Sequence, residues 1–186
     1  MADIKQHFWD DMVHRWAGLY AEAFPKHGDI STQNFWGYAF VIDHVWDPPP
    51  GEDADPELPE TRVLGAFGIS GYPVNPKNRN IMRRYLGKSS RVYAEYGPSY
   101  DKGHFIAHAT GGPIDANLFP QKREINRGWS KEGKRYREME RFVAAHPGIF
   151  VFSRPIYSDL GSCPFEVEFG YCDSKMNWRV EVFPNR

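Results

Sequence analysis

The sequence predicts an α+β protein. Residues 3–23 carry apolar side chains at three- to four-residue steps, which is the spacing of an amphipathic helix. Short aromatic and β-branched runs follow along most of the remaining chain and are typical of strands. The 17 glycines and 15 prolines among 186 residues favour a loop-rich body over a helical bundle.

Length and composition narrow the class further. The 186 residues suit one domain, or one domain with an appended lobe, and are enough to bury a core. The 13 Phe, 10 Tyr and 6 Trp argue against a disordered chain. No apolar run approaches the roughly 20 residues that a membrane helix needs, and charges within residues 1–25 argue against a secretory signal. We therefore expect a soluble protein that contacts no membrane.

The predicted elements follow the chain in order. After the first helix, we expect an exposed proline-rich loop at 47–60, a short basic helix at 77–88 and a longer helix at 123–146 that ends before Pro147. Strands are predicted at 34–46, 61–72, 91–97, 149–157, 165–171 and 177–183, the last three forming a β-meander. Cys163 and Cys172 bracket one of these strands, so they lie too far apart to form a disulfide.

Charge is balanced overall but not locally. The chain has 23 basic and 24 acidic residues, yet residues 43–60 hold seven acids and no Lys or Arg, and residues 122–141 hold eight basic residues against four acids. A basic strip of this kind either contacts a polyanion or is an ordinary solvated helix face.

Residues 101–126 carry the candidate chemistry. His104 follows a glycine at a predicted strand–loop junction, where its side chain can be presented to a ligand. Asn117, Gln121 and Asn126 supply neutral oxygen ligands near the start of the helix at 123–146, and basic residues crowd the same end. A histidine base, an oxygen ligand for a hard metal and a phosphate-attracting helix start are what a metal-dependent phosphodiesterase needs.

The spacing of these residues also resembles a known family. The order D-x-G-H, then N-x-x-P-Q, then an asparagine nine residues after the first, then a helix with a glutamate is similar to the DNA/RNA non-specific endonucleases of the His-Me finger (ββα-metal) superfamily. The run GHFIAHATGGPIDANLFPQKREINRG is most similar to their toxin-like branch, and the resemblance covers about residues 89–185. It implies a ββα-metal finger nuclease core at 89–186 with a mixed or antiparallel sheet, on which residues 1–88 pack as a helical and β extension.

The resemblance implies a role for each matching residue. His104 matches the general base and Glu140 the helix glutamate that orients metal-bound water; Lys102 stands where the family commonly has a catalytic-site arginine. Asn126 matches the ligand of a single divalent ion, usually Mg²⁺, with Mn²⁺ as another possibility. A helix break at Gly133 would pass the role of Glu140 to Glu138 or Glu132.

The remaining site residues fall into two groups. The supporting residues are Asp101, Asn117, Gln121 and His108, and the residues expected to contact nucleic acid are Lys122, Arg123 and Arg127.

The function that the resemblance implies is Mg²⁺-dependent hydrolysis of DNA or RNA with little sequence specificity. It also implies an antibacterial toxin effector with a cognate immunity protein, either cytoplasmic in the producing cell or delivered to target cells without a classical signal peptide. Two alternatives stay open. One is a catalytically silent nucleic-acid-binding module, and the other is an interaction protein dominated by the acidic loop 43–60 and the aromatic N-terminal half, with the finger as a scaffold.

Overall fold

The computed structural model describes residues 2–45, 60–73, 97–113, 117–159 and 161–186. Its helices are α1 (Ala2–Ala23), α4 (Arg123–Asn126) and α5 (Lys131–Ala145), with a short 3-10 turn, η1, at His108–Thr110. Its strands are β1 (Asp29–Phe35), β2 (Tyr38–Val45), β3 (Glu60–Ile69), β4 (Tyr100–His104), β5 (Leu118–Lys122), β6 (Phe150–Ile156), β7 (Glu166–Cys172) and β8 (Trp178–Pro184).

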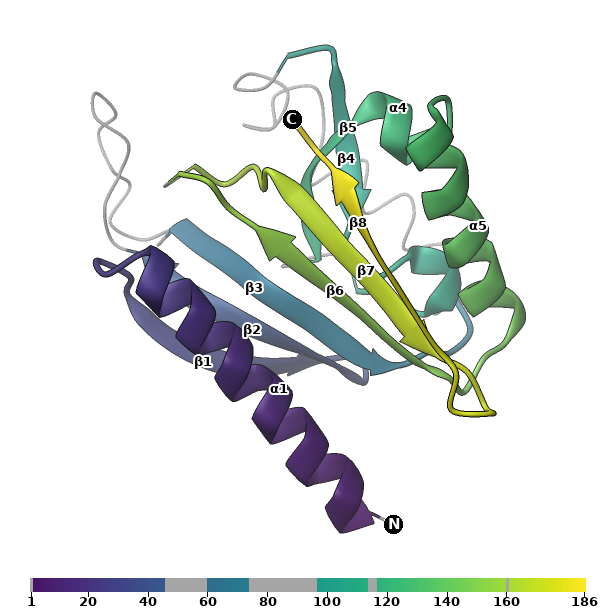
Figure 1. Cartoon of the computed structure of the whole chain (residues 1–186), viewed down its shortest axis with the longest axis horizontal. Helices are drawn as coiled ribbons and strands as arrows, with labels where there is room; N and C mark the ends of the chain where they lie inside the picture. Colours follow the sequence, from purple (N-terminus) through teal and green to yellow (C-terminus); the bar gives the residue numbers. More distant parts are fainter. Residues whose placement is uncertain (1, 46–59, 74–96, 114–116, 160) are drawn as a thin grey trace.

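Among these residues the strands form two antiparallel sheets. The larger has the order β1-β2-β3-β6-β7-β8, and the smaller is the β4–β5 hairpin. The α+β class is thereby confirmed. The long helix α1 lies across the large sheet, while α4 and α5 lie beside the hairpin and β8 (Figure 1). None of the described helices is long and apolar enough to cross a membrane.

Helix α1 is confirmed where the periodicity predicts it. Trp16 and Tyr20 form the buried part of its apolar face. The Trp16 ring lies 6.0 Å from the ring of Phe67 on β3 and 5.6 Å from that of Phe152 on β6. This packing makes one of two buried clusters; the other lies between the large sheet, α5 and the hairpin.

The predicted strand at 34–46 is confirmed as β2 over Tyr38–Val45, but its first residues belong to the end of β1 and to a turn that was not predicted. β1 pairs with β2 in a register that sets Phe35 opposite Tyr38, leaving only Trp36 and Gly37 in the turn. Both turn residues have positive φ, 51° and 88°, as a two-residue hairpin turn requires. Tryptophan rarely adopts this conformation, so the turn carried no recognisable sequence signal.

The predicted helix at 123–146 is divided. α4 ends at Asn126 and α5 begins at Lys131, with Gly128 between them at a φ of 70°. The possible break at Gly133 is not observed, because Gly133 lies inside the first turn of α5. Its backbone packs so closely against α4 that a Cβ atom would lie 2.3 Å from Glu124 O. The glycine therefore permits the approach of two helices rather than ending one.

The C-terminal β-meander is confirmed as β6, β7 and β8. Cys163 and Cys172 are both buried and form no disulfide. The predicted strand at 61–72 ends at Ile69. The predicted loop at 47–60 and helix at 77–88 lie outside the described residues, except for Glu60. Most of the predicted strand at 91–97 also lies outside the described residues, as does the predicted boundary between the extension 1–88 and the core 89–186.

Residues from both sides of that division share the large sheet. Ala66–Ile69 of β3 pair with Phe150–Ser153 of β6. The sheet thus contains three strands from residues 1–88 and three from residues 89–186.

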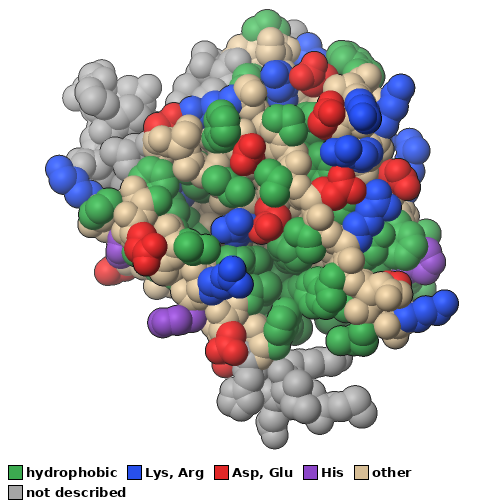
Figure 2. All heavy atoms as spheres, viewed as in Figure 1, with side chains coloured by type: hydrophobic (Ala, Val, Ile, Leu, Met, Phe, Trp, Pro, Cys, Tyr) green, Lys and Arg blue, Asp and Glu red, His purple; other side chains and the backbone are tan. Residues whose placement is uncertain are grey.

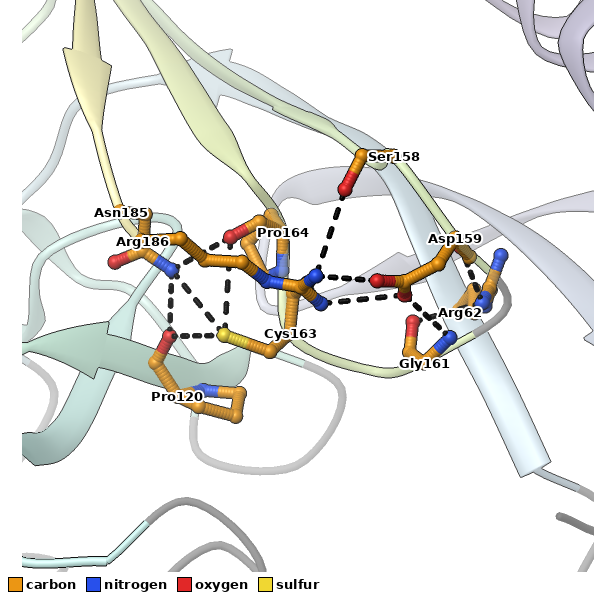
Figure 3. A network of polar contacts seen from close by, with 9 residues as sticks. All are labelled: Arg62, Pro120, Ser158, Asp159, Gly161, Cys163, Pro164, Asn185 and Arg186. Carbon is orange, nitrogen blue, oxygen red and sulfur yellow. Dashed lines mark hydrogen bonds and ion pairs between the residues drawn. The ribbon is translucent and has the colours of Figure 1, made fainter.

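The last residues of the chain fasten the hairpin to the large sheet (Figure 3). The Asn185 amide donates to Pro120 O and to Pro164 O, both at 2.9 Å, and its Oδ1 accepts from Lys122 N at 2.8 Å. Next to it, the Arg186 guanidinium pairs with Asp159. The position of β5 is therefore set by residues at the end of β8.

Candidate functional site

The centre of the candidate site is a hairpin followed directly by a short helix. β4 and β5 pair from Tyr100 with Lys122 to His104 with Leu118, so His104 is the last residue of its strand. α4 begins immediately after β5. This β–β–α order places the sequence-predicted residues of 101–126 on three adjoining elements.

Hydrogen bonds from Asn117 to the backbone fix the loop that follows β4. Phe105 N donates to Asn117 O at 2.9 Å. The buried Asn117 side chain accepts from Ile106 N and donates to Ile106 O and Pro113 O, at 2.7, 2.7 and 2.8 Å. A side chain that makes three buried hydrogen bonds to the backbone fixes a loop strongly, so Asn117 positions the residues next to His104.

The glycine before His104 has a packing reason. A Cβ atom on Gly103 would lie 2.4 Å from the Cβ of Gln121, which is 2% exposed. Only glycine lets the Gln121 side chain lie flat against the hairpin at this point. The G-H pair in the sequence therefore reflects the packing of Gln121 as well as the presentation of His104.

Asp101 gathers three of the predicted site residues. It accepts from Arg127 Nε at 2.6 Å and Nη2 at 3.1 Å, from Arg123 Nε at 3.1 Å and from Asn126 Nδ2 at 3.3 Å. Burial alone would raise the pKa of Asp101, but hydrogen bonds from Arg127, Arg123 and Asn126 outweigh it and lower the pKa. Asp101 therefore stays ionised and orients the helix that follows the hairpin.

Asn126 fits the requirements of a hard divalent cation. Its amide nitrogen is directed to Asp101, and this contact assigns the side-chain oxygen as the group available to a ligand. Magnesium prefers oxygen ligands and keeps several of its waters, so a site with one protein ligand suits it. Among residues 2–45, 60–73, 97–113, 117–159 and 161–186, no three His, Cys, Asp or Glu side chains are placed to share a metal.

Glu140 lies on α5, on the helix side that faces α4. Arg137, one turn earlier, donates to Asn126 O at 3.3 Å, which links this side of α5 to the predicted metal ligand. Burial raises the pKa of Glu140 to about 7, against the opposing effect of Arg137 and Arg141. The half-buried carboxyl can therefore hold or release a proton near neutral pH.

The two alternative glutamates lie elsewhere on the helix. Glu138 is exposed and faces Arg179 of β8 at 3.6 Å, and Glu132 is in the first turn of α5. The break in the predicted helix precedes α5, so it does not change the position of Glu140 relative to these two. Tyr136, one turn before Glu140, is buried. Burial is the main cause that raises the pKa of Tyr136, and the negative charge of Glu140 adds to it.

Strand alternation separates the predicted residues of β4. Asp101 and Gly103 are buried, whereas Lys102 and His104 are half-buried and belong to the other face of the hairpin. Burial lowers the pKa of Lys102. Asp101 thus contacts Asn126, whereas Lys102 and His104 lie two residues apart on the other face of the hairpin.

The basic residues at the start of α4 are paired with acids. Lys122 lies 3.5 Å from Glu124, and Arg123 and Arg127 share Asp101. Three cations against two carboxylates leave one net positive charge. Basic and acidic side chains are interspersed over the side of the molecule formed by α5 and β8 (Figure 2).

The expected phosphate-attracting helix start is corrected by the structure. α4 has four residues, and the backbone amides where it begins are occupied: Lys122 N by Asn185 Oδ1 and Arg123 N by Ser99 O, both at 2.8 Å. Attraction of phosphate at this point therefore depends on side chains. His108 begins η1, and its buried Nδ1 has no hydrogen-bond partner within the part of the chain that is described.

Sequence reasoning missed two residues beside the site. Arg137 contacts the Asn126 backbone, and Trp129 lies under the Arg127 guanidinium, 5.1 Å from the ring centroid to Cζ. The basic composition of 122–141 included Arg137 but gave no reason to single it out. Trp129 carried a signal of its own, because an aromatic residue between basic ones is typical of nucleic-acid binding.

Comparisons with known proteins add a distant likeness of fold. No protein-family model matches the sequence, and no curated protein matches it significantly. Among solved structures, the chain is similar to the Sda1 nuclease with a bound zinc ion, with a TM-score of 0.41 and 16% sequence identity over 84% of this chain and 74% of that one. At this TM-score and identity the likeness carries no weight for the role of any residue, and the roles of the site residues depend on the geometry described above.

Proposed function

We propose that this protein is a divalent-metal-dependent endonuclease that hydrolyses phosphodiester bonds of DNA or RNA with little sequence specificity. The observation that carries the proposal is the β4–β5–α4 unit, which ends one strand on His104 and orients Asn126 by a hydrogen bond to an ionised Asp101. The residue types and the β–β–α order of this unit support the resemblance to the His-Me finger endonucleases.

His104 is the general base in this proposal. The buried backbone network around Asn117 holds the loop after His104, so the strand end that carries the imidazole is fixed. A positioned base of this kind takes a proton from the water that attacks phosphorus. Lys102, on the same face of the hairpin, supplies positive charge close to the phosphate.

Asn126 would hold the metal, with Mg²⁺ the best match to its single hard oxygen and Mn²⁺ an acceptable replacement. The ion would supply charge neutralisation at the phosphate and leaving oxygen. Glu140, on the adjoining side of α5, would accept hydrogen bonds from water near Asn126.

Nucleic acid would be held mainly through its phosphates. Lys122, Arg123 and Arg127 provide charge without a pattern of donors and acceptors suited to one base. Binding that depends on phosphate contacts has little sequence preference and weakens steeply as salt rises.

Digestion of plasmid DNA and total RNA tests the proposal. We expect cleavage by the wild type in Mg²⁺ and none in EDTA. His104→Ala should lower the cleavage rate about 100- to 10,000-fold, the contribution of a positioned base. Asn126→Ala should raise the Mg²⁺ concentration for half-maximal cleavage about tenfold or more. Loss of a residue that only hydrogen-bonds to a metal ligand typically lowers metal affinity about 10- to 100-fold, and loss of the ligand itself should cost at least as much.

Matched controls separate these effects from general loss of structure. His14 on α1 and Asn34 on β1 are exposed, so His14→Ala and Asn34→Ala should cleave like the wild type. Cleavage by His104→Ala at the wild-type rate would refute the assignment of the base. Folded protein that binds DNA in EDTA and never cuts would instead favour the catalytically silent binding module.

The resemblance to the toxin-like branch further supports an antibacterial effector that a cognate immunity protein neutralises. The same variant pair addresses this role. Expression in bacteria should arrest growth for the wild type and not for His104→Ala, whereas equal growth of both strains would count against it.

A further inference from the structure

Trp129 is the most exposed tryptophan of the described residues. Its side chain is 63% exposed in the loop between α4 and α5, three residues after the predicted metal ligand Asn126. Exposure of so large an apolar surface carries a cost in water unless a ligand covers it.

The backbone around Trp129 is fixed. Trp129 N donates to Glu124 O at 2.8 Å, and Gly128 N donates to Ile125 O at 3.1 Å. On the other side, the Ser130 hydroxyl accepts from Gly133 N at 2.9 Å and caps α5. The ring is therefore presented from a loop that is tied to both helices.

Arg127 connects the ring to the site. Its guanidinium lies 5.1 Å from the centroid of the Trp129 ring and, at the same time, donates to both oxygens of Asp101. Asp101 in turn accepts from Asn126. An exposed aromatic surface thus adjoins the predicted metal ligand through one ion pair.

We propose that Trp129 is a stacking surface for the base of a nucleotide next to the cleaved phosphate, and that the preferred substrates are single-stranded nucleic acids or unpaired segments. This inference rests on the proposed function. In a duplex both faces of a base are covered by its neighbours, so a paired base must first be unstacked before it can stack on a side chain, whereas an unpaired base need not be. Stacking accepts any base, which agrees with little sequence specificity.

Binding and cleavage of a single-stranded oligonucleotide and its duplex test this inference. Binding is measured in the His104→Ala background, which leaves the substrate intact. Trp129→Ala should weaken single-strand binding about 5- to 150-fold, the range for loss of one stacked base, and change duplex binding less than twofold. Trp129→Phe, which keeps an aromatic face, should recover most of the affinity.

Trp36→Ala is the matched control, because Trp36 is 50% exposed in the β1–β2 turn. It should bind and cleave both substrates like the wild type. If Trp129→Ala loses affinity equally for single strands and duplexes, or loses none, the inference is overturned. Cleavage by the wild type would still support the proposed function in that case. Binding that depends on Trp129 without any cleavage would refute the proposed function and retain the stacking surface.

Discussion

At the scale of single residues, Asp101 and Glu140 show how burial and hydrogen bonding set two carboxyl groups apart. Asp101 is buried but accepts from Arg127, Arg123 and Asn126, and its pKa is lowered. Glu140 is half-buried, and burial raises its pKa to about 7 despite Arg137 and Arg141. One carboxyl is thus a permanent anion that orients its neighbours, and the other changes charge in the range where an enzyme works.

The raised pKa of Glu140 predicts a pH-dependent stability. Between pH 4.5 and about 7 the folded protein binds a proton at Glu140 that the unfolded chain releases, so this contribution to stability is complete below pH 4.5 and is lost as pH rises through 7. Glu140→Gln should therefore match the wild type near pH 4.5 and exceed it by about 1–3 kcal/mol at pH 8. Urea unfolding in EDTA across this range measures the difference.

Glu138→Gln is the control for this measurement, because Glu138 is exposed on the same helix. Its pH profile of stability should follow the wild type. A constant offset between Glu140→Gln and the wild type at all pH values would mean that the Glu140 carboxyl is solvated in the folded protein.

At the scale of elements, local patterns predicted some features and missed others for physical reasons. α1 and the strands of the C-terminal meander were found because each has its own periodicity. The β1–β2 turn was missed because Trp36 adopts a conformation that its residue type disfavours. The division between α4 and α5 was missed because Gly128 breaks an otherwise helical sequence.

The sequence singled out residue types for the candidate site but did not predict how they are arranged. Motif spacing singled out Asp101, His104 and Asn126 but gave no sign that Asp101 would bind two arginines and Asn126 together. Those contacts depend on how the hairpin and α4 pack, which is a property of the tertiary structure. The stacking of Trp129 on Arg127 depends on the same packing.

Packing between α1 and β3 gives a prediction at this scale. A Cβ atom on Gly65 would lie 2.3 Å from the ring of Trp16, so Gly65→Ala must displace the helix. We expect a loss of about 1–3 kcal/mol in the free energy of unfolding, the usual cost of overpacking a core. Chemical denaturation followed by circular dichroism measures it.

Gly18 on the same helix is the matched control. Nothing lies within 4 Å of the Cβ atom that Gly18→Ala would add. That variant should gain about 0.5–1 kcal/mol, because alanine favours an exposed helix position over glycine. Stabilisation by Gly65→Ala would show that α1 is not closely packed on β3.

At the scale of the whole molecule, Asn185 provides several of the hydrogen bonds between the hairpin and the chain around the large sheet (Figure 3). It is 1% exposed and bonds to β5 at Lys122 N and Pro120 O, and to Pro164 O before β7. A buried residue of this kind couples the candidate site to the stability of the large sheet.

Asn185→Ala should therefore affect both stability and activity. It removes the acceptor of Lys122 N and, among the described residues, leaves Pro120 O and Pro164 O with only the long contacts from Cys163 Sγ. An unsatisfied buried group costs about 1–3 kcal/mol, and the loss loosens β5 behind the site. We expect a lower melting temperature and faster amide hydrogen exchange in β5 than in β6. Asn177→Ala, in the exposed turn before β8, should change neither; exchange in β5 at the wild-type rate would contradict the coupling.

The pairing of β3 with β6 has a consequence for the chain as it is synthesised. The residues of β3 that end the first half of the large sheet find their partners about eighty positions later, at Phe150–Ser153. At roughly 5–20 residues per second, a ribosome would leave that strand edge open for about 4–16 seconds. During this interval β1, β2 and β3 present an unpaired edge on which another nascent chain could add a strand. Yield of native protein in the cell should therefore depend on chaperones that bind the first seventy residues during translation.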